Sequence, residues 1–202
     1  MRQNKVAGAG TVVLITLGVI ALIILMIVFW IMGSYNSLVQ TDVSVEKSWG
    51  NVQTAYERRL DLIPNLVATV KGSADFEKET QTQIAALRSG IRGAASPTDL
   101  DKVGTQANAL ITNLIVNVEA YPDLKSNVNF LALQDELAGT ENRIKWERDN
   151  YNGEVQTYKT KVRTFPTNII AGMFGFSLDK WDMFKAMEGS EVPPEVGFDF
   201  SE

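Results

Sequence analysis

An uncharged apolar run near the N-terminus constrains this chain more than any other feature. Residues 6–32 read VAGAGTVVLITLGVIALIILMIVFWIM, 27 residues without a charged side chain. An α-helix of that length extends roughly 40 Å at about 1.5 Å per residue, which exceeds the about 30 Å hydrocarbon core of a bilayer.

Arg2 and Lys5 precede the run, so a signal peptide is the alternative. Its apolar region would be only about 7–15 residues long and would end in a small-residue cleavage motif, which is not seen here. We therefore expect an uncleaved transmembrane helix over residues 6–32, after a short tail of residues 1–5.

The flanking charges predict the orientation of the transmembrane helix in the membrane. Arg2, Lys5 and the terminal amine precede the run, whereas Lys47 is the only basic residue among the first twenty that follow it. The positive-inside rule then favours a cytoplasmic N-terminus and an exported C-terminal domain.

Heptad spacing indicates a long amphipathic helix directly after the apolar run. In a heptad repeat, two rows of residues seven apart form the seam, the stripe that faces a neighbouring helix. Between Ser34 and Val70, eight of the ten seam positions are apolar. Pro64 lies inside this helix and has no amide to give to the carbonyl of Leu60, so we expect a kink or a local break there, and a stop at Gly72. The two rows are Leu38, Val45, Val52, Arg59 and Leu66, and Asp42, Trp49, Tyr56, Ile63 and Val70.

Three further helices are expected, and no stretch alternates with the period of a strand. The second runs from about Ala74 to Ile91. The third begins after the turn at residues 93–98, with Thr98 or Ser96 as its cap, and ends at the turn at residues 120–123. The fourth is as long as the first and has two rows: Phe130, Leu137, Ile144, Tyr151, Tyr158 and Phe165, and Gln134, Glu141, Arg148, Val155 and Val162. The fold class is therefore all-α, with a transmembrane helix followed by an elongated antiparallel helical bundle, coiled-coil-like in its packing, over residues 34–165.

Polar side chains occupy several seam positions of the two long helices. If these helices pack together, an unpaired charge between them would cost several kcal/mol. We expect Arg59 to pair with Glu141 and to set the register of the bundle. Arg148, Asn65 and Gln134 would complete the network, and Arg58 or Asn142 would satisfy the carbonyl freed at Pro64. The alternative is a ligand or partner site at the kink.

A second apolar cluster follows the bundle, in FPTNIIAGMFGF (residues 165–176) and WDMF (residues 181–184). It predicts an apolar C-terminal segment over residues 166–187 that contains a short helix, followed by an acidic extended tail over residues 188–202. Such a cluster has to be covered, either by folding back on the bundle, by another subunit or by the membrane interface. The candidate interface residues are Ile169, Ile170, Met173, Phe174, Phe176, Trp181 and Phe184.

Composition excludes several functional classes. The chain contains no Cys and no His, so it lacks the commonest zinc ligands, the usual nucleophile pairs and the usual neutral-pH general base. Its net charge of −5 gives no basic surface for nucleic acid. Close acidic pairs, such as Asp99 with Asp101 or Asp179 with Asp182, fit solvated helix starts better than a metal site. We therefore expect no catalytic, cofactor or metal site.

Several motifs together resemble the LemA family of bacterial membrane proteins. They include YNSLV (residues 35–39), RRLDLIPNLVATVKG (58–72), AYPDLKSNVNFLALQDEL (120–137), GTENRI (139–144), YN (151–152) and FPTNIIAGMFGF (165–176). The resemblance extends over nearly the whole chain in the family's order and spacing, except after Phe176. It implies a single-pass anchor in the bacterial inner membrane, a helical bundle and no established catalytic activity. It also implies a link to bacterial envelopes, sometimes to membrane metallopeptidases, and in one branch to magnetosome membranes.

Three functions follow as hypotheses. The first is a non-enzymatic, membrane-anchored scaffold of the cell envelope that forms a homo-oligomer through its bundle and apolar C-terminal segment. The second is a regulatory adaptor of a membrane metallopeptidase. The third, an enzyme that uses carboxylates alone, would need a concave pocket containing two carboxyl groups with shifted pKa values, which a helical bundle rarely provides.

Overall fold

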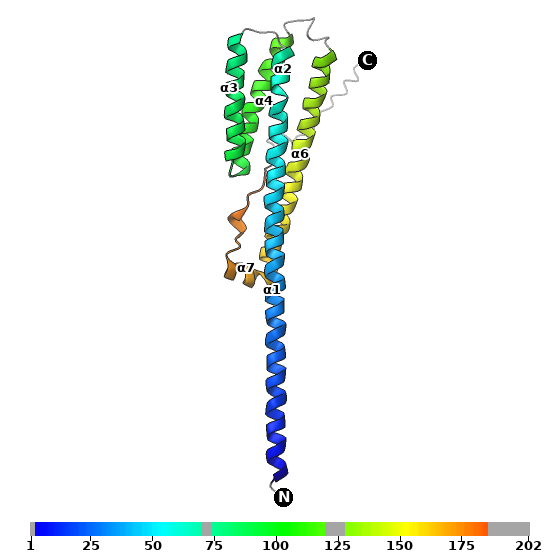
Figure 1. Cartoon of the computed structure of the whole chain (residues 1–202), viewed down its shortest axis with the longest axis vertical. Coiled ribbons are helices and arrows are strands. Elements are labelled where there is room, and N and C mark those ends of the chain that lie inside the picture. Colours follow the sequence, from blue (N-terminus) through cyan, green and yellow to red (C-terminus); the bar gives the residue numbers. More distant parts are fainter. Residues whose placement is uncertain (1–2, 70–73, 120–127, 186–202) are drawn as a thin grey trace, which may run out of the picture. The chain divides into compact units, whose positions relative to one another are not determined.

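The structure is a computed structural model that describes residues 3–69, 74–119 and 128–185 (Figure 1). Over these residues it is all-α and contains no strand. The helices are α1 (Gln3–Asp61), α2 (Ile63–Thr69), α3 (Ala74–Gly93), α4 (Pro97–Glu119), α6 (Val128–Arg163) and α7 (Thr167–Phe174), followed by the 3-10 turn η1 (Leu178–Lys180). The predicted fold class is confirmed. The predicted stop at Gly72, the turn at residues 120–123 and the tail at residues 188–202 lie outside the described residues.

Helix α1 joins the apolar run and the first heptad helix into one helix of 59 residues. The sequence suggested two adjacent helices, but the helix passes through Gly33 without a break (Figure 1). From residue 12 to residue 30 the side chains of the apolar run are exposed; Val12 is 63% exposed and Phe29 is 70% exposed. By its length and composition α1 is able to cross a membrane, which is consistent with membrane anchoring.

The chain divides into two compact units, and α1 and α6 contribute to both. The first unit comprises residues 1–51 and 153–181, and the second comprises residues 52–152 and 182–202.

In the first unit, parts of α1 and α6 pack with α7 and η1. The ammonium of Lys161 donates to the hydroxyl of Ser37 at 2.9 Å. Asp42 accepts from Lys180 Nζ at 2.6 Å and from Trp181 Nε1 at 2.8 Å, which satisfies a charged residue at a seam position. Burial raises the pKa of Tyr158, whose hydroxyl donates to the carbonyl of Ser177. The buried side chains include Leu38, Val45, Val155, Tyr158 and Ile170.

In the second unit, the end of α1 packs with α2, α3, α4 and the beginning of α6. Ion pairs between Glu57 and Arg92, at 2.8 Å, and between Asp61 and Arg88, at 2.5 Å, show that α1 and α3 run antiparallel. Helices α3 and α4 lie side by side in the same unit (Figure 1). The buried core includes Leu60, Ile63, Leu66, Ile91, Leu100, Leu114, Phe130 and Ile144.

Helix ends in this unit follow the local sequence. Ser96, rather than Thr98, caps α4, because its hydroxyl accepts the amide of Asp99 at 3.2 Å and donates to the Asp99 carboxylate at 2.7 Å. That second bond holds the pKa of Asp99 below its ordinary value. Near Pro64 the helix is interrupted at Leu62, whose amide bonds to the Arg59 carbonyl at 3.3 Å. The helix therefore breaks two residues before the proline, as its missing amide predicts.

One sequence expectation about the last heptad is wrong. Phe165 was expected to continue the buried row of the fourth helix, but α6 ends at Arg163 and Phe165 is 75% exposed. The reason is Pro166, which disfavours helical backbone at the residue before it.

Gly104 lets α4 approach α1 closely, and this predicts an unusual substitution effect. A Cβ at Gly104 would lie 2.6 Å from Cε1 of Tyr56. Gly104→Ala should therefore destabilise the protein by about 1–3 kcal/mol, even though alanine favours a helix by about 1 kcal/mol. Gly139→Ala is the matched control, because nothing lies within 4 Å of that position. It should stabilise the protein by about 0.5–1 kcal/mol. Urea unfolding in detergent, followed by circular dichroism, measures both; equal stabilisation by the two changes would contradict the close packing.

Candidate functional site

A cleft in the second unit is lined by two ion pairs, each with a largely buried arginine. It has a volume of about 490 Å³ and lies among α1, α4 and α6. We call it the polar cleft. Its lining residues are Tyr56, Arg59, Asp101, Gly104, Thr105, Asn108, Glu141, Ile144, Arg148 and Lys185.

The first charge pair of the polar cleft joins Arg59 of α1 to Glu141 of α6. The two side chains are unequally buried, since Arg59 is 13% exposed and Glu141 is 43% exposed. Burial lowers the pKa of Arg59, while the nearby Tyr56 opposes the shift. The guanidinium Nε of Arg59 is buried and has no hydrogen-bond partner within the described residues. Arg59 is therefore the more buried partner of the pair, and its charged guanidinium has Glu141 as its counter-ion.

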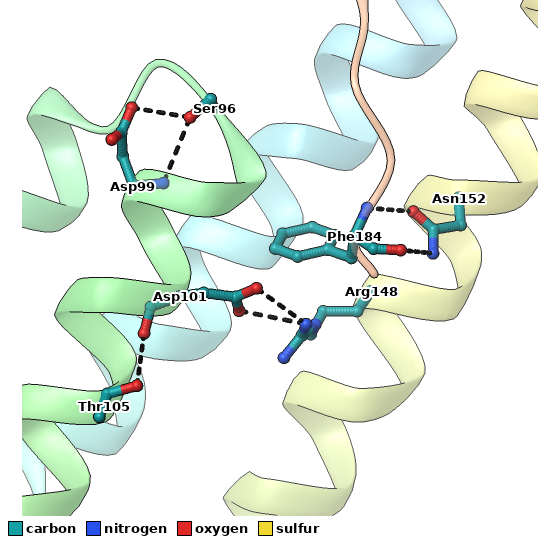
Figure 2. Close-up of polar contacts among 7 residues, drawn as sticks. All are labelled: Ser96, Asp99, Asp101, Thr105, Arg148, Asn152 and Phe184. Atoms are coloured by element: carbon teal, nitrogen blue, oxygen red, sulfur yellow. Dashed lines mark hydrogen bonds and ion pairs between the residues drawn. The ribbon is translucent and has the colours of Figure 1, made fainter. Parts of the chain in front are cut away.

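The second charge pair joins Arg148 of α6 to Asp101 of α4 (Figure 2). One guanidinium nitrogen lies 3.1 Å from Asp101 Oδ1 and 3.2 Å from Oδ2. The guanidinium carbon also lies 4.5 Å from the ring centroid of Phe184, a cation–π contact. Burial raises the pKa of Asp101, and the charge of Arg148 opposes this shift. Burial likewise raises the pKa of Tyr56, again against the charge of Arg148.

Phe184 is held in place by backbone contacts as well as by its ring. Its amide donates to Asn152 Oδ1 at 2.8 Å, and its carbonyl accepts from Asn152 Nδ2 at 3.0 Å (Figure 2). The hydroxyl of Tyr151 donates to the carbonyl of Asp182 at 2.9 Å, and the Tyr151 and Phe184 rings meet edge to face at 5.5 Å. Residues 182–184 are thus fixed to α6, with Phe184 beside Arg148.

The structure brings together part of the network expected from the sequence. Arg59 and Glu141 are paired, but Arg148 bonds to Asp101 instead of joining that pair. Among the described residues, no hydrogen bond or ion pair connects the remaining predicted members to it. Asn65, Asn142 and Arg58 are exposed, and Gln134 is half-buried.

Two polar partners, Asp101 in the polar cleft and Asn152 beside it, were not anticipated from the sequence. Asp101 was explained as a residue near a helix N-terminus, and Asn152 appeared only in the family motif at residues 151–152. A heptad row shows which side chains are buried on one helix but does not show which residue of another helix they face. The sequence feature that could have indicated such a partner is Arg148 at a seam position, because a buried arginine needs an acceptor from another element.

The chemistry of the polar cleft is that of paired charges. Each of its two carboxylates contacts a guanidinium, and the part of the chain that is described contains no group of three or more His, Cys, Asp or Glu residues able to hold a metal ion. The arrangement stabilises helix packing and offers no free carboxylate beside a nucleophile.

Comparison with known proteins agrees with the family motifs in the sequence. The model of the LemA family matches residues 48–198, which is most of the chain. The chain belongs to the LemA family. It is 28% identical over 148 residues to Protein LemA of Metamycoplasma hominis, a match that covers 71% of this chain and 66% of that relative. Magnetosome proteins MamQ 1 and MamQ 2 of Paramagnetospirillum magneticum are each 29% identical over 122 residues, which covers 60% of this chain and 43% of each relative. The chain therefore matches just under two thirds of the first relative's length and less than half of each of the other two.

The C-terminal interface candidates of this LemA-family chain divide into three groups by their burial. Ile170 is 2% exposed and Phe184 is 5% exposed, so each is buried within its own unit. Phe176 and Trp181 are half-buried. Ile169, Met173 and Phe174 are exposed and remain candidates for contact with something outside the chain.

The two partners of the Arg59–Glu141 pair should respond unequally to substitution. Glu141→Ala leaves a mostly buried guanidinium without a counter-ion, so we expect a loss of about 1–3 kcal/mol in the free energy of unfolding. Arg59→Met removes the more buried charge and leaves a carboxylate that is 43% exposed, although its Oε2 is buried in the parent protein, so its cost should be lower, at about 1 kcal/mol or less. Urea titration of both variants and of the double variant Arg59→Met/Glu141→Gln tests this. Equal losses from the two single changes would show that the pair does not behave as a buried cation with a solvated partner.

Tyr151 predicts how stability changes at alkaline pH. Burial raises its pKa to about 12, and the charge of Asp182 adds to the shift. Between pH 10 and 12 the unfolded tyrosine loses its proton while the folded one keeps it, so stability falls as the pH rises through this window. Tyr151→Phe should reduce that fall by about 1–2 kcal/mol, measured as the difference in unfolding free energy at pH 9 and pH 11.5. Other tyrosines titrate in both proteins, so an unchanged slope would exclude the raised pKa of Tyr151.

Proposed function

We propose that this LemA-family protein is a non-enzymatic scaffold, anchored in the bacterial inner membrane, that assembles with other copies of itself. The observation that carries the membrane-anchored part of the proposal is the continuity of α1. The same helix supplies an exposed apolar stretch long enough to cross a bilayer and core side chains such as Leu38 and Val52, which are 0% exposed. This continuity supports a helical bundle that is held at the membrane.

Paired charges in the polar cleft favour a structural role over an enzymatic one. Arg148 is held by Asp101 and Phe184, and Arg59 is paired with Glu141. A general acid or base needs a titratable group that is free to exchange its proton with a substrate. We therefore assign these pairs to helix register and to attachment of the C-terminal segment.

The proposed orientation places the N-terminus in the cytoplasm and the bundle outside it. Arg2 and Lys5 lie directly before the apolar run, and Lys47 is the only basic residue among the first twenty that follow it. Fusions of alkaline phosphatase and of green fluorescent protein to the C-terminus test this. Active phosphatase with a dark fluorescent fusion is expected, and the opposite pattern would reverse the assignment.

Self-assembly is tested on the full-length protein in mild detergent. Light scattering coupled to size exclusion should give a protein mass that is a multiple of the 22.3 kDa chain. A mass of one chain at all concentrations would remove the scaffold proposal. In-cell crosslinking adds a second readout, because self-adducts support the scaffold, whereas a dominant adduct with a membrane metallopeptidase would support a regulatory adaptor.

A further inference from the structure

Helix α7 presents apolar side chains both to its own unit and to the outside. Ile170 and Ala171 are buried. On the outer side Ile169 is 53%, Met173 71% and Phe174 52% exposed, and Phe165 just before the helix is 75% exposed. We call these four exposed residues the α7 face. Several large apolar side chains exposed on one short segment of a folded protein indicate a contact with a partner or a membrane.

Aromatic contacts place the α7 face beside the end of the apolar run of α1. The ring of Tyr35 lies 4.8 Å from that of Phe174 and 6.0 Å from that of Phe176, measured between centroids. Tyr35 follows Met32, the last residue of the apolar run, by three residues, which is about 4–5 Å along a helix. The headgroup region on each side of a bilayer is about 5–8 Å thick. Helix α7 therefore lies where the headgroup region would begin if the apolar run crosses a membrane.

The local chemistry is that of a membrane interface. Residues 164–178 contain no charged side chain, whereas Arg163 and Asp179 flank this stretch. Trp30 is 41% exposed and Tyr35 is 37% exposed at the same end of the apolar run. Tryptophan and tyrosine are enriched at membrane–water interfaces, because one part of the ring is apolar and another forms hydrogen bonds.

We propose that the α7 face inserts into the headgroup and upper acyl region of the lipid bilayer, so that the protein contacts the membrane with α7 as well as with α1. The proposal rests on the membrane anchoring in the proposed function. Lipid alone would then cover both the exposed Phe29 and Met32 of α1 and the α7 face. A second copy is the less suitable occupant, because an eight-residue helix about 12 Å long offers far less than the roughly 1,200–2,000 Å² that a stable protein interface buries.

Membrane depth measured with spin labels tests the proposal on the full chain. The protein has no cysteine, so each introduced cysteine gives one label. Met173→Cys and Ile169→Cys report on the α7 face, Val19→Cys on the apolar run, and Gln156→Cys on an exposed position of α6 in the same unit. After reconstitution into phosphatidylcholine vesicles, the accessibility of each label to oxygen is compared with its accessibility to a water-soluble nickel chelate. The expected oxygen-to-nickel ratio is highest at residue 19, intermediate at residues 169 and 173, and lowest at residue 156.

Each other outcome overturns the proposal in a distinguishable way. If the label at residue 19 is deep while residues 169 and 173 match residue 156, the anchor stands but α7 lies in water. If residues 169 and 173 are shielded from both reagents, a second copy covers α7, which overturns lipid contact while favouring self-assembly. If the label at residue 19 is itself exposed to the nickel chelate, the membrane anchoring fails and the α7 proposal fails with it.

Discussion

Two arginines placed in the middle of the apolar run should remove the protein from the membrane. The double variant Val19→Arg/Ile23→Arg puts two charges on one face of α1, near the centre of residues 6–32. Each arginine at the centre of a membrane helix disfavours insertion by about 2.5–3.5 kcal/mol, so the pair should disfavour it by about 5–7 kcal/mol. The uncharged stretches that remain on either side are both shorter than the about 20 residues needed to span a bilayer.

Flotation through a density gradient measures this effect, because inserted protein rises with lipid and aggregated protein sediments. Val19→Leu/Ile23→Leu is the matched control and should float like the parent protein. Both positions are about half exposed in the structure, at 53% and 49%, so their side chains are not part of the core. Thermal unfolding of the bundle in detergent should therefore be unchanged. A double-arginine variant that floats as the parent does would contradict the transmembrane assignment.

The burial pattern of the long helices could be predicted from the sequence because it depends on periodicity alone. A residue repeated every seventh position stays on one face of a helix, whichever helix lies opposite. Leu38, Val45 and Val52 are all 0% exposed, and Tyr151 and Tyr158 on the other long helix are 1% and 0% exposed. The same reasoning located the interruption near Pro64, because a missing amide is a local property of the chain.

The partners of buried polar groups could not be predicted in the same way. Asp42 is at a seam position on α1, but its donors, Lys180 and Trp181, come from more than a hundred residues further along the chain. Arg148 is at a seam position on α6, but its acceptor is Asp101, on a helix whose register against α6 is not encoded in either heptad pattern. Contacts of this kind depend on tertiary packing, which local periodicity does not determine.

The burial of Glu147 could not be predicted from the heptad pattern either. It is 2% exposed, although it does not belong to either heptad row identified on its helix. Arg143, one turn earlier, lies 2.6 Å from one of its carboxylate oxygens, and the other oxygen is buried without a hydrogen-bond partner within the described residues. On sequence alone the two residues are a surface pair at i,i+4 spacing, which contributes little to stability. The Glu147 carboxylate is buried by tertiary packing. Removing it should therefore affect the stability of the protein more than removing a surface carboxylate would.

Arg148 should be the most sensitive charged residue of the second unit, because it connects three elements. It pairs with Asp101 of α4, lies over the ring of Phe184, and is itself only 10% exposed on α6. Arg148→Ala removes the ion pair, the cation–π contact of about 0.5–2 kcal/mol and the packing of the side chain, so we expect a total loss of about 2–4 kcal/mol. Arg148→Lys retains the charge but not the planar group over the ring, and should recover only part of that loss.

A local readout separates attachment of the C-terminal segment from overall stability. Lys185 directly follows Phe184 and is exposed, so trypsin cleavage there reports how firmly residues 182–184 are held on α6. Cleavage should become faster in Arg148→Ala, and also in Phe184→Leu, which keeps an apolar side chain but loses the aromatic ring. Asp101→Asn is the matched control, because it weakens the ion pair while leaving the contact with Phe184 in place; it should lower stability with little change in cleavage. If all three variants accelerated cleavage equally, the ring contact would have no separate role, and the segment would be retained only by the general stability of the unit.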